Sequence, residues 1–206
     1  MIPMLIAGFL LGLSVAVPLG PVGATVIREG LERGTLPAFL IGLGAATVDF
    51  FYLTLVYLGV APLLQAIPWL MTGFYLLGAL LLGQMAWYSL TRAREGGLPP
   101  AATGRGKGFL FGLGITLFNP STIVSWLGLG GAFASAWLTG RGWGEAAAAL
   151  LAVFAGSLAW FATLSLAVGL ARRALGSRPW VYRAVNLTAG LALAVFAAAF
   201  LWRAVA

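Results

Sequence analysis

Pro18-Leu19-Gly20-Pro21 interrupts the first long apolar run of the chain, which extends over residues 4–26. Proline has no amide hydrogen and clashes with the carbonyl group four residues earlier, so the two prolines release the carbonyl groups of Ser14 and Val17 from helical bonding. Gly20 allows the chain to turn between them. Because about 20 apolar residues suffice to cross a bilayer, the sequence predicts a membrane-spanning helix that is broken within the membrane.

A second break is predicted in the apolar run 108–136, at Asn119-Pro120-Ser121. Pro120 releases the carbonyl group of Thr116 in the same way. Residues 8–13 read GFLLGL and residues 108–113 read GFLFGL, so the two broken runs also begin alike. Similar starts followed by similar breaks indicate that the chain contains a duplicated half.

Six apolar runs fill nearly the whole chain, and each is long enough to cross a membrane. They are 4–26, 37–59, 68–90, 108–136, 146–170 and 182–204. Only 8% of the residues are charged and 61% are apolar, which excludes a water-soluble enzyme because a soluble surface needs far more charge. Three spans in each half is an odd number, so the halves must lie in opposite orientations. The predicted fold is an all-α polytopic membrane protein, with six transmembrane helices arranged as two inverted three-helix repeats and spans 1 and 4 broken.

The basic residues orient these spans within one integral membrane domain. The domain is expected to consist of a first repeat over residues 1–90, a cytoplasmic loop over 91–107 and a second repeat over 108–206. Ten of the 12 basic residues lie on one side, at Arg28, Arg33, Arg92, Arg94, Arg105, Lys107, Arg172, Arg173, Arg178 and Arg183, against Arg141 and Arg203 on the other. Because Lys and Arg are enriched in cytoplasmic loops, both termini are predicted to lie outside the cytoplasm of a bacterium, with the spans in its inner membrane.

Two charge pairs follow the first break at helical spacing, Arg28 with Glu32 and Glu29 with Arg33. Opposite charges four residues apart stabilise an isolated helix by a few tenths of a kcal/mol. We therefore expect this segment to form a solvated helical turn between spans 1 and 2.

Asp49 is the one acidic residue near the middle of a predicted span. A charge at the bilayer centre costs a few kcal/mol or more, so Asp49 is expected to face the interior of the bundle. The functional interpretation is proton or cation coupling, or contact with a cationic group of the substrate. The structural alternative is a protonated carboxyl group bonded to a neighbouring backbone or hydroxyl group.

The two breaks and Asp49 define a candidate transport site, because paired breaks in corresponding halves favour a binding site. The structural alternative for the breaks is a pair of kinked helices whose released backbone groups are bonded by neighbouring groups. A new half-helix begins beyond each break, and the amides around Val22-Gly23 and Thr122-Ile123 are expected to attract an anionic group such as a carboxylate. Ser121 is expected to cap its half-helix through the hydroxyl group, and the released carbonyl groups to hold an ammonium group or a small cation. The predicted substrate-binding residues are Pro18, Gly20, Pro21, Val22, Asn119, Pro120, Ser121 and Thr122. The predicted residues for proton or cation coupling are Asp49, Ser14, Val17 and Thr116.

These motifs resemble those of the lysine exporter (LysE) superfamily, which includes the homoserine and threonine exporters. Its members are small six-span proteins with a Pro-Gly-Pro type motif in span 1, a Gly-x₄-Asp-like element in span 2 and an Asn-Pro motif in span 4. The resembling stretches here are Gly20-Pro21, Gly44–Asp49, Asn119-Pro120, Gly156–Trp160 and Asn186–Gly190. Leu19 stands where the family commonly has Pro, and Ser121 stands where many amino-acid exporters carry Lys.

The resemblance implies a secondary, proton-coupled exporter of a small solute, an amino acid or a derivative, and not an enzyme. One alternative is an inorganic cation transporter of the same superfamily, although one embedded carboxylate without histidine or cysteine makes a poor transition-metal site. A non-transport membrane assembly subunit is the other. The chain has no cysteine and no histidine, so we expect no metal, no cofactor and no thiol chemistry. The expected partners are a small-molecule substrate and the lipid bilayer, with no nucleic acid, and a homodimer is left open.

Overall fold

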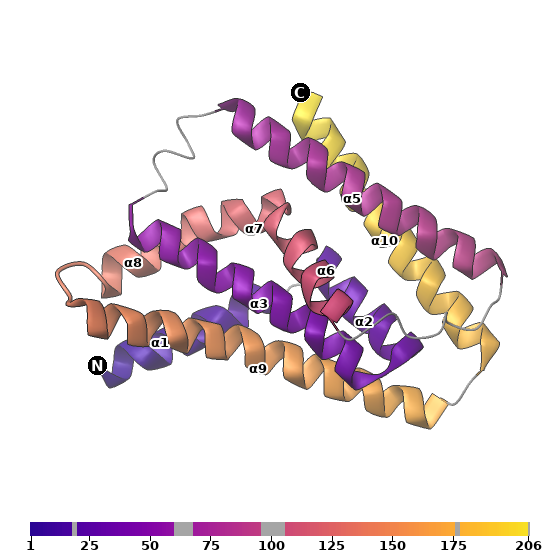
Figure 1. Cartoon of the computed structure of the whole chain (residues 1–206), viewed down its shortest axis with the longest axis horizontal. Helices are drawn as coiled ribbons and strands as arrows, with labels where there is room; N and C mark the ends of the chain where they lie inside the picture. The colour runs from indigo at the N-terminus through magenta and orange to yellow at the C-terminus, as the bar shows by residue number, and fades with distance from the viewer. Residues whose placement is uncertain (18–19, 60–67, 96–105, 176–177, 206) are drawn as a thin grey trace.

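The computed structural model describes residues 1–17, 20–59, 68–95, 106–175 and 178–205, which form helices joined by short connections, with no strand among them (Figure 1). The elements are α1 (Ile2–Ala16), α2 (Pro21–Arg33), α3 (Thr35–Tyr57), α5 (Pro68–Glu95), α6 (Gly106–Leu117), α7 (Pro120–Ser125), the π-helix η1 (Trp126–Gly130), α8 (Gly131–Trp137), α9 (Trp143–Leu175) and α10 (Pro179–Val205). By length and composition, α3, α9 and α10 can each cross a membrane, and up to five spans result if each bent pair of helices counts as one. The all-α class is confirmed, and the count of six spans stays a prediction.

Two pairs of helices are bent sharply at the predicted breaks. α1 and α2 meet at 75°, and α6 meets the α7–α8 segment at 63°. α2 begins at Pro21 and α7 begins at Pro120, which is the helical position where the missing amide hydrogen of proline is harmless. Pro18 and Leu19 lie outside the described residues. The breaks themselves therefore occur where the prolines predict them.

α1 packs closely along α9 because glycines lie on both sides of the crossing. A Cβ atom on Gly12 would meet the carbonyl group of Val153, and one on Gly156 would meet the carbonyl group of Phe9. Small residues at a helix crossing allow the two backbones to approach each other, as is common in membrane proteins. This close approach holds the end of α1, and with it the first break, against α9.

α6 packs along α3 in the same manner. A Cβ atom on Gly112 would meet the carbonyl group of Ile41, and one on Gly44 would meet that of Phe109. α5 and α10 form a third pair, and they lie side by side apart from the α3–α9 layer (Figure 1). The short helix α2 contacts α3, α9 and α10, and the short helix α7 contacts α5 and α6.

Replacing Gly112 by alanine is expected to destabilise the protein by about 1–3 kcal/mol, because the added methyl group overlaps the backbone of α3. Gly114→Ala is the matched control in the same helix, since a Cβ atom there meets nothing described within 4 Å. That change is expected to be neutral or stabilising by up to about 1 kcal/mol, because alanine favours a helix more than glycine does. Thermal unfolding of the purified variants measures the difference, and equal stability of the two would contradict the close crossing.

The charged turn of α2 is buried, so the expectation of a solvated turn is wrong. Arg28 and Glu32 are only 5% and 4% exposed. The guanidinium Nη1 of Arg28 donates to Ser89 Oγ of α5 at 2.6 Å, and Asn186 Nδ2 of α10 donates to Glu32 Oε1 at 2.6 Å. The α5–α10 pair covers this turn and supplies the polar groups that buried charges require.

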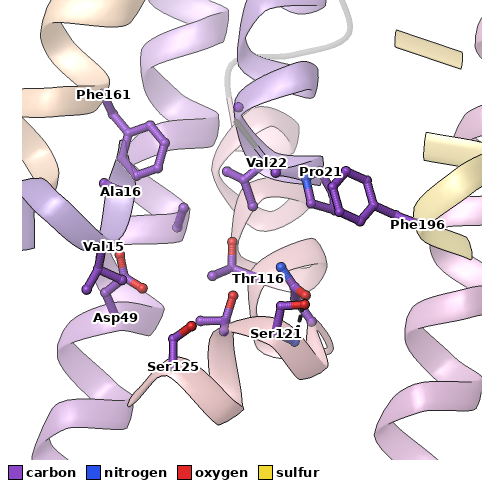
Figure 2. Close-up of a pocket in the computed structure, with 15 residues that line it drawn as sticks. Val15, Ala16, Pro21, Val22, Asp49, Thr116, Ser121, Ser125, Phe161 and Phe196 are labelled. Atoms are coloured by element: carbon purple, nitrogen blue, oxygen red, sulfur yellow. Dashed lines mark hydrogen bonds between the residues drawn. The ribbon is translucent and has the colours of Figure 1, made fainter. Parts of the chain in front are cut away.

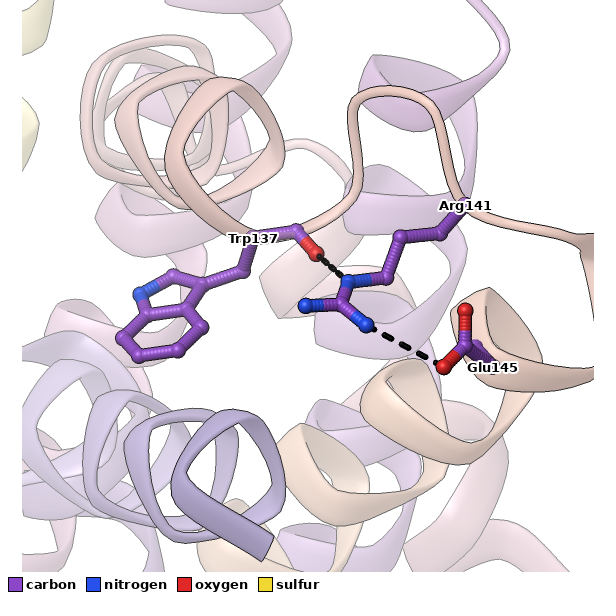
Figure 3. Close-up of polar contacts among 3 residues, drawn as sticks. All are labelled: Trp137, Arg141 and Glu145. Carbon is purple, nitrogen blue, oxygen red and sulfur yellow. Dashed lines mark hydrogen bonds and ion pairs between the residues drawn. The ribbon is translucent and has the colours of Figure 1, made fainter. Parts of the chain in front are cut away.

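The connection between α8 and α9 is closed by one exposed arginine (Figure 3). Arg141 Nε donates to the carbonyl oxygen of Trp137 at 3.0 Å, and its Nη1 pairs with Glu145 Oε1 at 3.1 Å. Gly140, with φ of +74°, provides the left-handed residue that reverses the chain. One side chain thus bonds the last turn of α8 and the first turn of α9.

Candidate functional site

A cavity of about 280 Å³ lies between the two helix breaks (Figure 2). Val15 and Asp49 lie on one side of it, Pro21 and Phe196 lie on the other, and Thr116 lies between them. The wall therefore combines the end of α1, the start of α2, the middle of α3 and the α6–α7 break with side chains of α9 and α10. A site between discontinuous helices is the arrangement in which several transporters hold their substrates.

Most of the sequence-predicted site residues meet at this cavity. Its wall includes Gly20, Pro21, Val22, Asp49, Thr116, Asn119, Ser121 and Thr122. Pro120 is buried but is not among the residues that line the cavity. Ser14 on α1 and Val17, the residue after α1, are exposed and do not line it either. The end of α1 presents Val15 and Ala16 to the cavity instead. Pro18 lies outside the described residues.

Asp49 is held in the wall by two hydrogen bonds from different helices. Its side chain is 5% exposed. Trp126 Nε1 of η1 donates to Asp49 Oδ1 at 2.8 Å, and Ser157 Oγ of α9 donates to Asp49 Oδ2 at 3.1 Å. Both of these donors are neutral, so the carboxyl group is positioned without its charge being cancelled. Such a group can carry either a negative charge or a proton.

The start of α7 is capped by Asn119, so the expectation that Ser121 caps it is wrong. The Asn119 carboxamide oxygen accepts from the Ser121 amide at 3.1 Å. The Thr122 and Ile123 amides donate to the Asn119 carbonyl oxygen at 3.0 and 3.2 Å, and the Asn119 amide donates to the Thr116 carbonyl oxygen at 3.2 Å. These groups therefore already have partners, and the sequence-based view of them as open binding groups is corrected. In the tight turn over residues 116–119, the Asn119 amide bonds the Thr116 carbonyl group, which Pro120 cannot bond because it lacks an amide hydrogen.

The start of α2 differs from the start of α7. Its N-cap residue is Gly20, which has no side chain to cap the helix, and Pro21 follows at the first helical position. The amides of Val22 and Gly23 belong to the first turn and therefore have no partner within the helix. Gly20, Val22 and Gly23 all line the cavity. The positive end of α2 is thus directed to the cavity without a capping side chain.

Several residues of the site were not predicted from the sequence, and four of them have a clear structural role. Trp126 and Ser157 bond Asp49, and Phe161 and Phe196 form apolar walls. A buried indole needs an acceptor for its N–H group, so a tryptophan inside a predicted span is a signal that could have pointed to Trp126. The two phenylalanines are apolar residues in apolar helices, and no local pattern separates them from lipid-facing ones.

The model of the LysE type translocator family matches residues 13–204 of the chain. "Putative amino acid efflux protein YcgF" of Bacillus subtilis (strain 168) is 30% identical over 189 residues, which cover 90% of this chain and 89% of the relative. "Chemotactic transduction protein ChpE" of Pseudomonas aeruginosa is 31% identical over 144 residues, which cover 65% of this chain and 66% of that relative. No solved structure gives a significant match.

Proposed function

Because the chain belongs to the LysE type translocator family, we propose that it is a proton-coupled secondary exporter of a small amino acid or amino-acid derivative. The observation that carries this proposal is the cavity between the two helix breaks, with Asp49 in its wall. The relative named "Putative amino acid efflux protein YcgF" supports the substrate class.

The cavity offers complementary groups for both charges of an amino acid. The uncapped amides of Val22 and Gly23 at the start of α2 suit the carboxylate, because helix N-termini attract anions. The carboxylate of Asp49 lies across the cavity and suits the ammonium group (Figure 2). Phe161 and Phe196 leave an apolar surface for the side chain. A bare cation would use only the Asp49 side of this arrangement.

Exchange of substrate against protons follows if both compete for Asp49. A carboxylate that holds the ammonium group cannot hold a proton at the same time, and the protonated acid has no charge to attract the substrate. Substrate that leaves the site would be replaced by a proton from outside. The proton then returns the empty carrier to the cytoplasmic side, so the proton gradient drives export.

The reciprocal packing of the helices supports two inverted repeats over residues 1–90 and 108–206. α1 of the first half packs on α9 of the second, and α6 of the second half packs on α3 of the first. The last helices of the two halves, α5 and α10, pack on each other. A pseudo-two-fold axis in the membrane plane produces this exchange of neighbours.

Both termini are proposed to lie outside the cytoplasm of a bacterium, because of the uneven distribution of Lys and Arg. The chain has no native cysteine, so single cysteines introduced near either terminus and in the 91–107 loop can be labelled separately in whole cells. An impermeant thiol reagent is expected to label the termini from outside and to leave the loop unlabelled. Labelling of the loop alone would reverse the orientation.

Counterflow in proteoliposomes tests the proposed function. Liposomes that contain the purified protein are loaded with one solute, and uptake of the same labelled solute is measured for a panel of amino acids and inorganic cations. We expect counterflow of at least one amino acid and none in empty liposomes. Counterflow of cations alone would favour the cation transporter, and its absence for every solute would favour a role other than transport.

A further inference from the structure

We propose that Ser157 is a positioning residue that transmits the protonation of Asp49 to α1, a step that rests on the proposed proton coupling. Ser157 Oγ lies 3.1 Å from Asp49 Oδ2 and 3.1 Å from the carbonyl oxygen of Gly12 in α1. Its side chain is fully buried. The hydroxyl group has one hydrogen, so it can donate to only one of these two acceptors at a time.

Trp126 determines which oxygen of Asp49 carries the proton. The indole Nε1 is a donor only, and it donates to Asp49 Oδ1 at 2.8 Å. Oδ1 must therefore remain an acceptor in both protonation states. The unprotonated oxygen of a carboxylic acid is the better acceptor for the indole N–H, so the proton on Asp49 is favoured on Oδ2, which is the oxygen that faces Ser157.

The direction of the Ser157 hydrogen bond then follows from the charge of Asp49. When Asp49 is ionised, Ser157 donates to Oδ2, because a hydrogen bond to a charged acceptor is the stronger one. When Asp49 is protonated, Oδ2–H donates to Ser157 Oγ, and the Ser157 hydrogen turns to the carbonyl oxygen of Gly12. Protonation therefore forms a hydrogen bond between α9 and α1, and deprotonation breaks it.

The position of Gly12 makes this bond relevant to the cavity. Gly12 lies at the close crossing of α1 and α9, where a Cβ atom would meet the backbone of Val153. α1 ends at Ala16, about one helical turn later, and both Val15 and Ala16 line the cavity. A change in the bond at Gly12 thus acts on the segment that forms one wall of the site and precedes the first break.

Besides Asp49, the titratable residues of α3 and of the elements packed against it either lie toward the ends of those elements or bond groups other than Asp49. Tyr52 on α3 itself donates to the carbonyl oxygen of Leu117. The described hydrogen-bond partners of Asp49 are Trp126 and Ser157. The charged residues of the neighbouring elements are Arg28, Glu29, Glu32 and Arg33 in the second half of α2, Lys107 at the start of α6, and Glu145, Arg172 and Arg173 near the ends of α9.

A single cysteine in the cavity wall tests the switch without any transported substrate. Val15→Cys is made in the otherwise cysteine-free chain, and the full-length protein is labelled in proteoliposomes with a water-soluble thiol reagent over a pH series. Because a thiol becomes more reactive as pH rises, each rate is divided by that of glutathione in the same buffer. The same measurement is made in the Ser157→Ala, Ser165→Ala and Asp49→Asn backgrounds.

Ser165→Ala is the matched control, because Ser165 is also fully buried on α9 and its hydroxyl group has no hydrogen-bond partner among the described residues. We expect the normalised rate to change with pH in the Val15→Cys protein and in the Ser165→Ala variant. This pH-dependent change is expected to be lost in the Ser157→Ala variant. The Asp49→Asn variant is expected to show, at every pH, the normalised labelling rate that the Val15→Cys protein shows at acidic pH. A pH-dependent change that survives in Ser157→Ala, or that is absent from the Val15→Cys protein, would overturn the proposal.

A second variant keeps the test valid if Ser157→Ala does not fold. Trp126→Phe removes the donor to Oδ1, so the proton is no longer directed to Oδ2. The pH-dependent change in the labelling rate is therefore expected to shrink, and an unchanged response would overturn the proposal.

The result of this test is also separable from the proposed function. Loss of the switch with intact amino-acid counterflow removes only this inference, whereas an intact switch without amino-acid counterflow removes the proposed amino-acid export and leaves the switch standing.

Discussion

Asp49→Asn is expected to abolish proton-driven transport and to leave the protein folded. Asparagine has the same size, and its oxygen can accept from Trp126 while its amide donates to Ser157, so both hydrogen bonds of Asp49 are preserved. It cannot bind or release a proton near neutral pH. Uptake driven by a pH gradient in proteoliposomes should therefore fall to the level of empty liposomes.

Glu145→Gln is the matched acid-to-amide control, because Glu145 lies in an exposed ion pair with Arg141 at the start of α9. It is expected to transport like the unmodified protein. Elution in detergent and the unfolding temperature show whether the Asp49→Asn protein has kept its fold. Proton-driven uptake at the normal rate by a folded Asp49→Asn protein would leave Asp49 with a structural role only.

Asn119→Leu is expected to weaken substrate binding by at least about tenfold, which corresponds to about 1.4 kcal/mol. Asn119 lines the cavity and caps α7 through its side chain. Leucine removes the cap, which costs about 0.5–2 kcal/mol, and places a branched apolar group at the cavity wall. Gly20→Leu at the other break is expected to act similarly, because its side chain would cover the open amides of α2.

Asn119→Ser distinguishes the effect of losing the helix cap from the effect of the bulky leucine side chain. Serine is a good N-cap residue and is smaller than asparagine, so α7 should remain capped and the cavity should stay open. Affinity is measured by the substrate concentration that gives half-maximal counterflow, with the solute found in the panel. If Asn119→Leu and Gly20→Leu both bind substrate normally, the site does not lie between the two breaks.

The local features of the site could be read from the sequence because their causes are local. Pro21 and Pro120 lack an amide hydrogen, and each begins a new helix for that reason alone. Asp49 is buried, as the cost of a charge in the membrane requires. Neither conclusion depends on the neighbouring helices, so neither needed the tertiary structure.

The partners of these groups are decided by the tertiary structure. Asp49 bonds Trp126 and Ser157, which are 77 and 108 residues away in the chain, because the glycines at the crossings allow α3, α9 and the α6–α8 segment to approach closely. Burial of Arg28 likewise depends on Ser89 of α5. Composition and proline placement thus determined by themselves an all-helical chain for the membrane, with helices broken at two points. Which side chains meet at those points depends on helix crossings between segments far apart in the sequence, and no local pattern of residues encodes such a meeting.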